Sequence, residues 1–270
     1  MFKIFNISQH DKWDKYLAYI SEKYRDIYFN PNYYKLYELN GDGEAFCFVF
    51  EIDGYIALYP FLMNSINNLG YDLDEKYFDI QGAYGYNGVI SNSDDYIFRE
   101  KFFDVFGAYC KKNNIVSEFT RFHPVLENHK FSGGFMDIFL NRNTVVLDLE
   151  RDKEEICKNS YSSTNRNMIR KALKNEVRIF ESNSLNDYKL FYSIYSETMQ
   201  NVDAEPYLFF SEEYFLNFMN YLPDNHKLVL AEYNSELVGG MILMIHNDYA
   251  HYHLSGRKSA YGKLALNNLF

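Results

Sequence analysis

Two hairpins, one in each half of the chain, constrain its fold more than any other feature of the sequence. Residues 44–50 and 55–63 are apolar and aromatic, and they flank Asp53-Gly54, a dipeptide typical of two-residue β-hairpin turns. Residues 228–233 and 237–245 form a second pair of the same kind around a short polar turn. The sequence therefore predicts a β-sheet in each half.

Helices and further strands follow the same order around both hairpins. Helical spacing of apolar residues comes before each hairpin, and a third strand, a loop and a helix come after it. The predicted helices span residues 11–24, 32–39, 93–112, 153–173, 185–200 and 211–222, with one more beginning near Leu264. The further strands span 115–122, two stretches within 135–148, 177–180 and 249–254. This repeated order indicates an internal duplication.

We therefore predict an α/β (α+β) fold of two tandem domains, residues 1–145 and 146–270. Each domain is expected to be a mixed, mostly antiparallel sheet flanked by helices. A chain of 270 residues is long enough for two cores of roughly 100–150 residues each. The second half ends inside the helix that matches one in the first, so we expect the second domain to be incomplete.

Composition narrows the class of protein. A hydrophobic fraction of 47% with 24% charged residues is typical of a globular chain, not a disordered one. The net charge of −10 disfavours nonspecific nucleic-acid binding by the chain as a whole, although it leaves room for one basic patch. Three distant cysteines, Cys47, Cys110 and Cys157, suit a reducing compartment. With no signal-peptide pattern and no membrane-length apolar run, we expect a cytoplasmic protein.

The loop at residues 82–88, GAYGYNG, places three glycines three residues apart among aromatic side chains. Glycine permits positive φ and close approach of another group, so the loop either lines a binding site or is an irregular connection. Arg121 and His123, at the end of the first-half strand, form a second polar cluster.

Residues 157–178 are the one clearly basic segment. On a helix, Arg166, Arg170, Lys171 and Lys174 share one face, and Met168, Ile169, Ala172 and Leu173 share the opposite face. We expect the apolar face to pack inward. The basic face is then either a phosphate-binding surface, because guanidinium forks bind phosphate well, or an ordinary solvated face.

The strands of the second half carry glycines and histidines. Gly239 and Gly240 inside a predicted strand indicate a bulge or the close approach of a ligand. In the next strand, alternation puts Ala250, Tyr252 and Leu254 on one face and His251, His253 and Ser255 on the other. We expect the apolar face to pack on a helix, leaving two imidazoles as candidate bases or as hydrogen-bonded structural residues. The spacing supplies no third metal ligand, so no metal is expected.

A loop at residues 256–263 joins that strand to the last predicted helix. Backbone N–H groups at a helix start attract anions, and Arg257, Lys258 and Lys263 add positive charge. The loop lacks the P-loop pattern. It is nevertheless a candidate anion site.

Taken in order, GAYGYNG, R-F-H-P, N-R-N-M-I-R-K-A, Y-x-x-T-M and H-Y-H-L-S-G resemble the Fem-type branch of the GNAT acyltransferase superfamily, in its short form. The resemblance covers nearly the whole chain. It implies that Tyr84, Gly85, Tyr86 and Gly88 line a substrate cleft, with Ala83 where the family usually has proline. The family's basic helix matches Asn165, Arg166, Ile169, Arg170, Lys171 and Ala172, and it implies a phosphate-bearing ligand.

This resemblance implies an N-acyltransferase that moves an acyl group from acyl-CoA to an amine of a cell-envelope or glycoconjugate precursor. The expected acceptor is a small molecule or a lipid-linked or nucleotide-linked precursor, and DNA is not an expected partner. Alternatives are an aminoacyl-tRNA-dependent peptidoglycan-bridge transferase and a noncatalytic binder of nucleotide-sugar precursors. The expected catalytic residues are His251, His253 and the backbone N–H at Gly240, with Tyr84 positioning the acceptor. The coenzyme A signature is only loosely echoed by Arg257, Lys258, Gly262 and Lys263.

Overall fold

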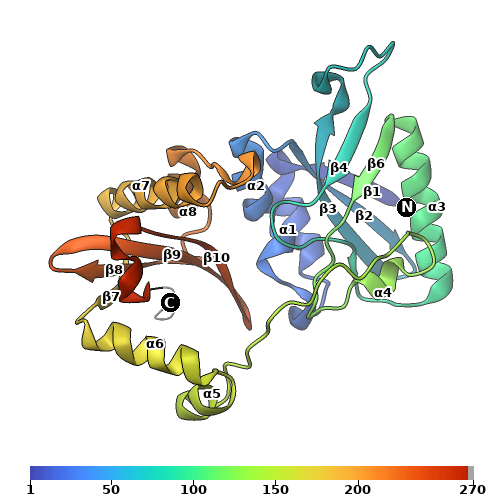
Figure 1. Ribbon diagram of the computed structural model, residues 1–270. Helices are drawn as coiled ribbons and strands as arrows, with labels where there is room; N and C mark the ends of the chain where they lie inside the picture. Colours follow the sequence, from blue (N-terminus) through green and yellow to red (C-terminus); the bar gives the residue numbers. More distant parts are fainter. Residues whose placement is uncertain (267–270) are drawn as a thin grey trace. The chain divides into compact units, whose positions relative to one another are not determined.

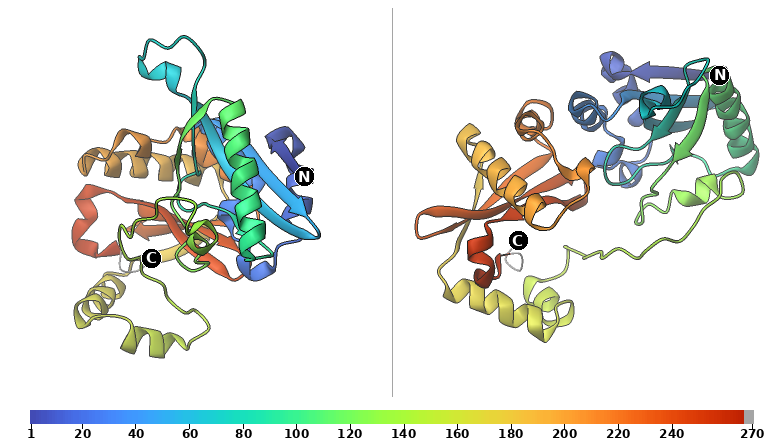
Figure 2. Two further views of the ribbon diagram at one scale, coloured as in Figure 1. Left: turned by 90° about the vertical axis from the view of Figure 1, so that its right-hand side faces the viewer. Right: turned by 45° about the horizontal axis from the view of Figure 1, so that its top comes forward.

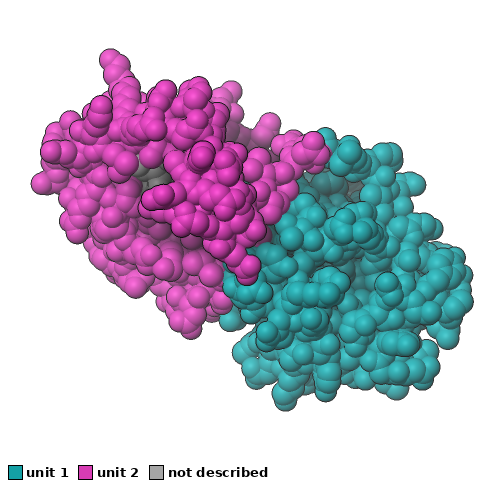
Figure 3. Space-filling view, turned by 90° about the horizontal axis from the view of Figure 1, so that it is seen from below, with its two compact units in different colours: residues 1–141, 246–249 teal, residues 142–245, 250–270 magenta. Residues whose placement is uncertain are grey.

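The computed structural model describes residues 1–266, and the chain divides into two compact units. Unit 1 comprises Met1–Asn141 together with His246–Tyr249, and unit 2 comprises Arg142–Ile245 and Ala250–Phe270 (Figure 3). The boundary near residue 145 stays a prediction, because unit 1 also includes four residues from the second half of the chain.

Unit 1 is built on one six-stranded sheet. Its order is β1-β2-β3-β4-β6, with β5 pairing with β3, and only the β4–β6 pair is parallel. The strands are β1 (Phe2–Asn6), β2 (Glu44–Ile52), β3 (Tyr55–Ser65), β4 (Phe78–Gln81), β5 (Ile90–Ser91) and β6 (Ile115–Phe119). Asp53 and Gly54 have φ values of 52° and 85°, so the predicted hairpin turn is confirmed.

Aromatic side chains form the core of unit 1. Helix α3 (Tyr96–Lys112) begins after Asp95, whose carboxylate accepts a hydrogen bond from the Phe98 N–H at 2.9 Å. The helix crosses one face of the sheet (Figure 2), where Phe102 packs edge-on against Phe48. Helices α1 (His10–Leu17) and α2 (Pro31–Asn40) also belong to this unit. Many of the Phe and Tyr residues are therefore core residues.

Several short elements complete unit 1. The 3₁₀ turn η3 (Ile27–Phe29) is fully buried and follows Asp26. The remaining short helices are η1 (Ile7–Gln9), η2 (Glu22–Tyr24), η4 (Ile66–Leu69) and α4 (His129–Ser132).

Unit 2 is built on a four-stranded sheet of order β10-β9-β8-β7. The strands are β7 (Arg178–Ser182), β8 (His226–Tyr233), β9 (Glu236–His246) and β10 (Tyr249–Arg257). The β7–β8 and β8–β9 pairs are antiparallel, and Asn234 and Ser235 turn the hairpin with φ values of 52° and 62°. The prediction of two mostly antiparallel sheets flanked by helices is confirmed.

Helices cover both faces of the unit 2 sheet. Helices α7 (Leu185–Asn201) and α8 (Glu212–Tyr221) lie on one face, and α6 (Ser163–Lys174) and η6 (Ser259–Leu264) lie on the other (Figure 1). Helix α5 (Lys153–Asn159) and the short η5 (Pro206–Leu208) complete the unit. None of the helices within residues 1–266 is both long and apolar enough to cross a membrane.

Several predicted elements differ from the structure. The helix predicted over residues 11–24 is wrong in its second half, because α1 ends at Leu17 and only the short η2 follows. The two strands predicted within residues 135–148 are wrong, because this stretch has no strand and leaves Leu140 and Val145 at 90% and 97% exposure. The helix predicted over 153–173 is two helices, since the Ser162 hydroxyl caps the start of α6 by accepting the Asn165 N–H at 3.1 Å. The helix expected from Leu264 lies mostly outside the described residues.

Candidate functional site

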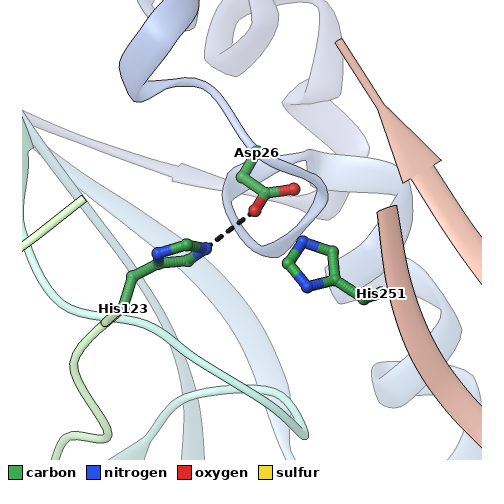
Figure 4. A group of neighbouring side chains, drawn as sticks. All are labelled: Asp26, His123 and His251. Carbon is green, nitrogen blue, oxygen red and sulfur yellow. Dashed lines mark hydrogen bonds and ion pairs between the residues drawn. The ribbon is translucent and has the colours of Figure 1, made fainter. Parts of the chain in front are cut away.

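A buried carboxylate–imidazole pair lies at the centre of the unit 1 site. Asp26 precedes η3 and His123 follows β6, and both residues are 0% exposed. The Asp26 Oδ2 and His123 Nε2 atoms lie 2.8 Å apart (Figure 4). Burial of a carboxylate is costly unless donors surround it. The third side chain that Figure 4 labels, His251, belongs to unit 2.

Backbone contacts fix the tautomer of His123. Its Nδ1 accepts hydrogen bonds from the N–H groups of Val125 at 3.2 Å and Leu126 at 3.1 Å. The ring proton is therefore on Nε2 and is donated to Asp26. The other Asp26 oxygen accepts the Ile27 N–H at 2.6 Å. The pair thus joins the start of η3 to the R-F-H-P turn and sets the orientation of the imidazole.

The three glycines of the 82–88 loop are each required by close packing. A Cβ on Gly85, whose φ is 108°, would lie 2.2 Å from the Tyr28 ring. A Cβ on Gly88, whose φ is 106°, would lie 2.7 Å from the Asn128 amide nitrogen. A Cβ on Gly82 would lie 2.5 Å from Asn87. The loop is therefore folded tightly onto its neighbours.

Two asparagines tie this loop to the R-F-H-P turn. The Asn87 N–H donates to the Arg121 carbonyl at 2.8 Å, and the Asn128 side-chain amide donates to the Asn87 carbonyl at 2.9 Å. The Asn128 Oδ1 accepts the His123 N–H at 2.8 Å. The sequence clusters at 82–88 and 121–123 therefore form one hydrogen-bonded assembly within unit 1.

Tyrosines surround the His123 ring. The ring centroids of Tyr86, Tyr249 and Tyr28 lie 5.1, 5.9 and 6.0 Å from that of His123. Burial, assisted by the negative charge of Asp26, raises the pKa of the Tyr28 hydroxyl. Tyr86 and Tyr84 are half-buried, whereas Arg121 is exposed. This part of unit 1 therefore presents aromatic faces and a guanidinium to solvent, over a buried and rigid support.

The α6 arginines that were expected to bind one phosphate together point to different partners. The Arg166 guanidinium turns back to the α5–α6 connection, where Nη1 donates to the carbonyls of Lys158 at 3.1 Å and Tyr161 at 2.5 Å. Arg170 is exposed and donates to the Asn167 Oδ1 at 3.1 Å. The two guanidinium groups therefore do not converge on one point.

The remaining α6 residues show which face packs. Lys171 and Lys174 are exposed, and Ala172 on the opposite side is buried. The expectation that Leu173 packs inward is wrong, because this side chain is 61% exposed. Ala172 is the one fully buried residue of α6, so this helix buries only a narrow stripe.

The expectation that the apolar face of β10 packs on a helix is wrong for Ala250 and Tyr252, which are exposed, whereas Leu254 is buried. His253 is 7% exposed and its Nε2 lies 3.0 Å from the Tyr214 hydroxyl on α8, whereas Tyr252 is 54% exposed. Burial, with a smaller contribution from the charge of His251, lowers the pKa of His253 to about 3. His253 is therefore a neutral core residue near pH 7. His251, which is half-buried, keeps its place as a candidate base.

The glycines of β9 make room for neighbours on both faces of the sheet. The register shifts opposite Val238, so the strand irregularity lies just before Gly239. A Cβ on Gly240 would lie 2.7 Å from the Leu230 side chain and 2.9 Å from the Phe191 ring of α7. Close helix packing therefore explains Gly240, and an oxyanion role for its N–H stays a prediction.

The loop expected to bind an anion uses its N–H groups internally. Those of Arg257, Lys258 and Ser259 donate, each at 2.9 Å, to the Thr198 hydroxyl, the Val238 carbonyl and the Glu197 carboxylate.

The side chains of the same loop are also engaged. The Lys258 ammonium pairs with Glu236 at 2.6 Å. A Cβ on Gly262 would lie 2.7 Å from the Arg257 guanidinium, which therefore lies over this glycine. Lys263 is exposed. The N–H groups of Arg257, Lys258 and Ser259 and the Lys258 ammonium are therefore already engaged by protein acceptors.

A small pocket lies beside this loop. It has a volume of about 160 Å³ and is formed within unit 2 by the end of α7 and the end of β10. Its walls are Thr198, Asn201, Val202, Ser255, Gly256, Arg257 and Ser259. Only Arg257 among the predicted cofactor-binding residues takes part in it.

Sequence reasoning did not identify Asp26, Asn87 or Asn128. Asp26 is 97 residues from its partner His123, so no local pattern announces the pair. The one available signal is an acidic residue directly before the buried Ile27–Phe29 run. A carboxylate in such a place needs a partner.

Comparison with known proteins agrees with the motifs. The FemAB family model matches residues 109–238, which include the R-F-H-P turn and α6. No curated protein matches the chain by sequence. The fold is similar to the crystal structure of FemX, with a TM-score of 0.65, 13% identity and coverage of 99% of this chain and 83% of FemX.

A second similar structure is the C-terminal domain of a protein from Agrobacterium fabrum named as a putative lysylphosphatidylglycerol synthetase. Its TM-score is 0.54 with 12% identity, over 98% of this chain and 72% of that one. At such low identity both likenesses concern the fold. The FemAB match over residues 109–238 and these two fold likenesses agree with the resemblance drawn from the motifs, so this chain is similar to Fem-type proteins.

Proposed function

We propose that this protein is an aminoacyltransferase that transfers an aminoacyl group from aminoacyl-tRNA to an amine of a cell-envelope precursor. The observation that carries the proposal is the FemAB match over residues 109–238, on a fold similar to that of FemX. A cytoplasmic reaction is part of the proposal.

The acceptor site that we propose is the surface of unit 1 formed by Tyr84, Tyr86 and Arg121. Aromatic faces suit sugar rings and peptide side chains, and an exposed guanidinium suits a phosphate or carboxylate. The buried His123 and Asp26 are positioning residues, because they hold the turn that carries Arg121 and support the Tyr86 ring. Preorganised support of this kind is what a binding site requires.

The donor that we propose is aminoacyl-tRNA, which replaces acyl-CoA as the favoured candidate. The 256–263 loop was the expected site for coenzyme A phosphates, yet its N–H groups at Arg257, Lys258 and Ser259 already donate to protein acceptors. A pyrophosphate would have to displace those bonds. Acyl-CoA therefore becomes the alternative that the experiment below tests.

In the proposed reaction the acceptor amine attacks the ester carbonyl of the aminoacyl group. A C–N amide bond forms, the C–O bond to the ribose breaks, and the proton lost by the amine is balanced by one gained by the ribose hydroxyl. His251 is the proposed proton acceptor, because the low pKa of His253 removes that residue from the role. The Gly240 N–H is the proposed oxyanion donor.

The test supplies the purified protein with radiolabelled aminoacyl-tRNA or with radiolabelled acetyl-CoA, each with a UDP-linked peptidoglycan precursor. Label should move to the precursor from aminoacyl-tRNA only. Arg121→Ala should raise KM for the precursor, while Arg142→Ala, a change of equal charge outside the proposed site, should leave KM unchanged. Transfer from acetyl-CoA alone would reverse the choice of donor. Precursor binding without transfer from either donor would indicate a noncatalytic binder.

A further inference from the structure

Helix α6 carries positive charge that the rest of the structure does not neutralise. Arg170, Lys171 and Lys174 are exposed, and none of them forms an ion pair with a carboxylate within residues 1–266. Elsewhere in unit 2 lysines do find partners, as Lys227 does with Glu181 at 2.8 Å. In a chain of net charge −10, unpaired cations on one helix make a distinct local field.

These cations form a line along the helix. Arg166, Arg170 and Lys174 recur every four residues, and Lys171 lies beside Arg170; we call these four residues the α6 stripe. At 1.5 Å per residue, the stripe extends over about 12 Å with a cation roughly every 6 Å. The carbonyl partners of Arg166 orient its guanidinium but do not neutralise it. Within residues 157–178 the one acidic residue is Glu176, just beyond the end of the helix.

The length of the stripe selects among phosphate-bearing ligands. A single diphosphate concentrates its charge at one point and needs two converging cations, which Arg166 and Arg170 do not provide. A polynucleotide backbone instead repeats one negative charge every few ångströms along its path, so it can meet several cations in sequence. Such contacts supply affinity and orientation without reading bases.

We propose that the α6 stripe binds the backbone of an RNA, namely the donor tRNA. This inference rests on the proposed function and names the surface of unit 2 that would hold the donor. The acidic remainder of the chain repels a polyanion, so binding is confined to the stripe.

The experiment measures binding of fluorescently labelled, deacylated tRNA by anisotropy across a series of salt concentrations. The variant is Arg170→Gln/Lys171→Gln/Lys174→Gln. The control, Lys101→Gln/Lys111→Gln/Lys112→Gln, removes three exposed charges from α3 of unit 1. The α6 variant should bind about tenfold more weakly or worse, and the magnitude of its log–log salt slope should fall by about 2–3, because each lost phosphate contact lowers it by roughly 0.7–0.9. The control should keep the wild-type slope.

Equal weakening in the α3 control would overturn the inference, since net charge alone would then explain the loss. An unchanged salt slope in the α6 variant would also overturn it. Displacement of tRNA by UDP-N-acetylglucosamine at equal concentration would assign the stripe to a nucleotide sugar. Should the triple variant fail to fold, Lys171→Gln/Lys174→Gln tests the same point with two charges. Deacylated tRNA carries no group to transfer, so this binding result stands apart from the transfer assay.

Discussion

The His123 imidazole donates its Nε2 proton to the Asp26 carboxylate across 2.8 Å, in a part of unit 1 that has no solvent exposure. The two residues are 97 positions apart, so their bond joins the buried η3 turn to the turn that carries Arg121. An ion–neutral hydrogen bond in a dry interior is strong, and its loss leaves a costly unpaired group.

Removing the Asp26 carboxylate should therefore destabilise unit 1. Asp26→Ala leaves the His123 Nε2–H buried without its acceptor, and we expect a loss of about 1–3 kcal/mol in the free energy of unfolding. Asp26→Asn keeps an oxygen acceptor and should lose less. Denaturant unfolding measures both, with Asp104→Ala on the exposed side of α3 as the control. If Asp26→Ala unfolds at the same denaturant concentration as Asp104→Ala, the pair does not stabilise the site.

Gly85 should tolerate no side chain. Gly85→Ala introduces a Cβ 2.2 Å from the Tyr28 ring at a φ of 108°, so clash and backbone strain act together. Gly41→Ala is the matched control, because Gly41 has a φ of 92° with nothing within 4 Å of the added carbon. The control should lose roughly 1–2 kcal/mol from strain alone, and Gly85→Ala should lose clearly more. Equal losses in thermal unfolding would mean that Tyr28 moves aside freely.

Substitutions of the two α6 arginines should have different effects on the free energy of unfolding. Arg166→Ala removes the donor to the Lys158 and Tyr161 carbonyls, and we expect a loss of about 0.5–1.5 kcal/mol. Arg170→Ala should change stability by less than about 0.5 kcal/mol, because Arg170 is exposed.

Two substitutions at Arg170 should differ in tRNA affinity. Arg170→Ala should weaken tRNA binding about tenfold, and Arg170→Lys should restore part of it, since the charge remains but the planar fork is lost. Thermal unfolding of the Arg166→Ala, Arg170→Ala and Arg170→Lys variants measures stability, and anisotropy titration of the same variants measures tRNA affinity, each against wild type. A destabilised Arg170→Ala would show that this residue is structural.

The sequence predicted features whose residues are contiguous, and it did not predict contacts between residues far apart in the chain. The hairpins were predictable because Asp53-Gly54 and its neighbouring strands are contiguous, and the turn dictates the pairing. The Asp26–His123 pair was not, because nothing near either residue specifies a partner 97 positions away.

The packing expected of the apolar face of β10 was wrong at Ala250 and Tyr252 for another reason. Helices lie on both faces of the unit 2 sheet, so apolar alternation alone does not mark a single inner face (Figure 1). His253 then packs under α8, while Tyr252 on the presumed inner face is exposed. At Leu140 and Val145 the apolar pattern was read as strand, but a strand forms only where another strand pairs with it.

The buried His253 should leave a signature in the pH dependence of stability. Its pKa is about 3 in the folded protein, below the ordinary value of 6.5, because burial disfavours the charged ring. The unfolded chain therefore binds one more proton than the folded chain between these pH values. Stability contributed by the neutral ring is fully present above pH 6.5 and is lost as the pH falls towards 3, at about 1.4 kcal/mol per pH unit.

His253→Asn keeps a polar group beside Tyr214 but cannot titrate, so the difference in unfolding free energy between wild type and variant should shrink as the pH falls from 7 to 4. The burial of His226 also lowers its pKa, but it is present in both proteins and cancels in the difference. Denaturant unfolding at several pH values measures the effect. A difference that stays constant over this range would mean that His253 titrates alike in the folded and unfolded chains, and that it is accessible to serve as a base after all.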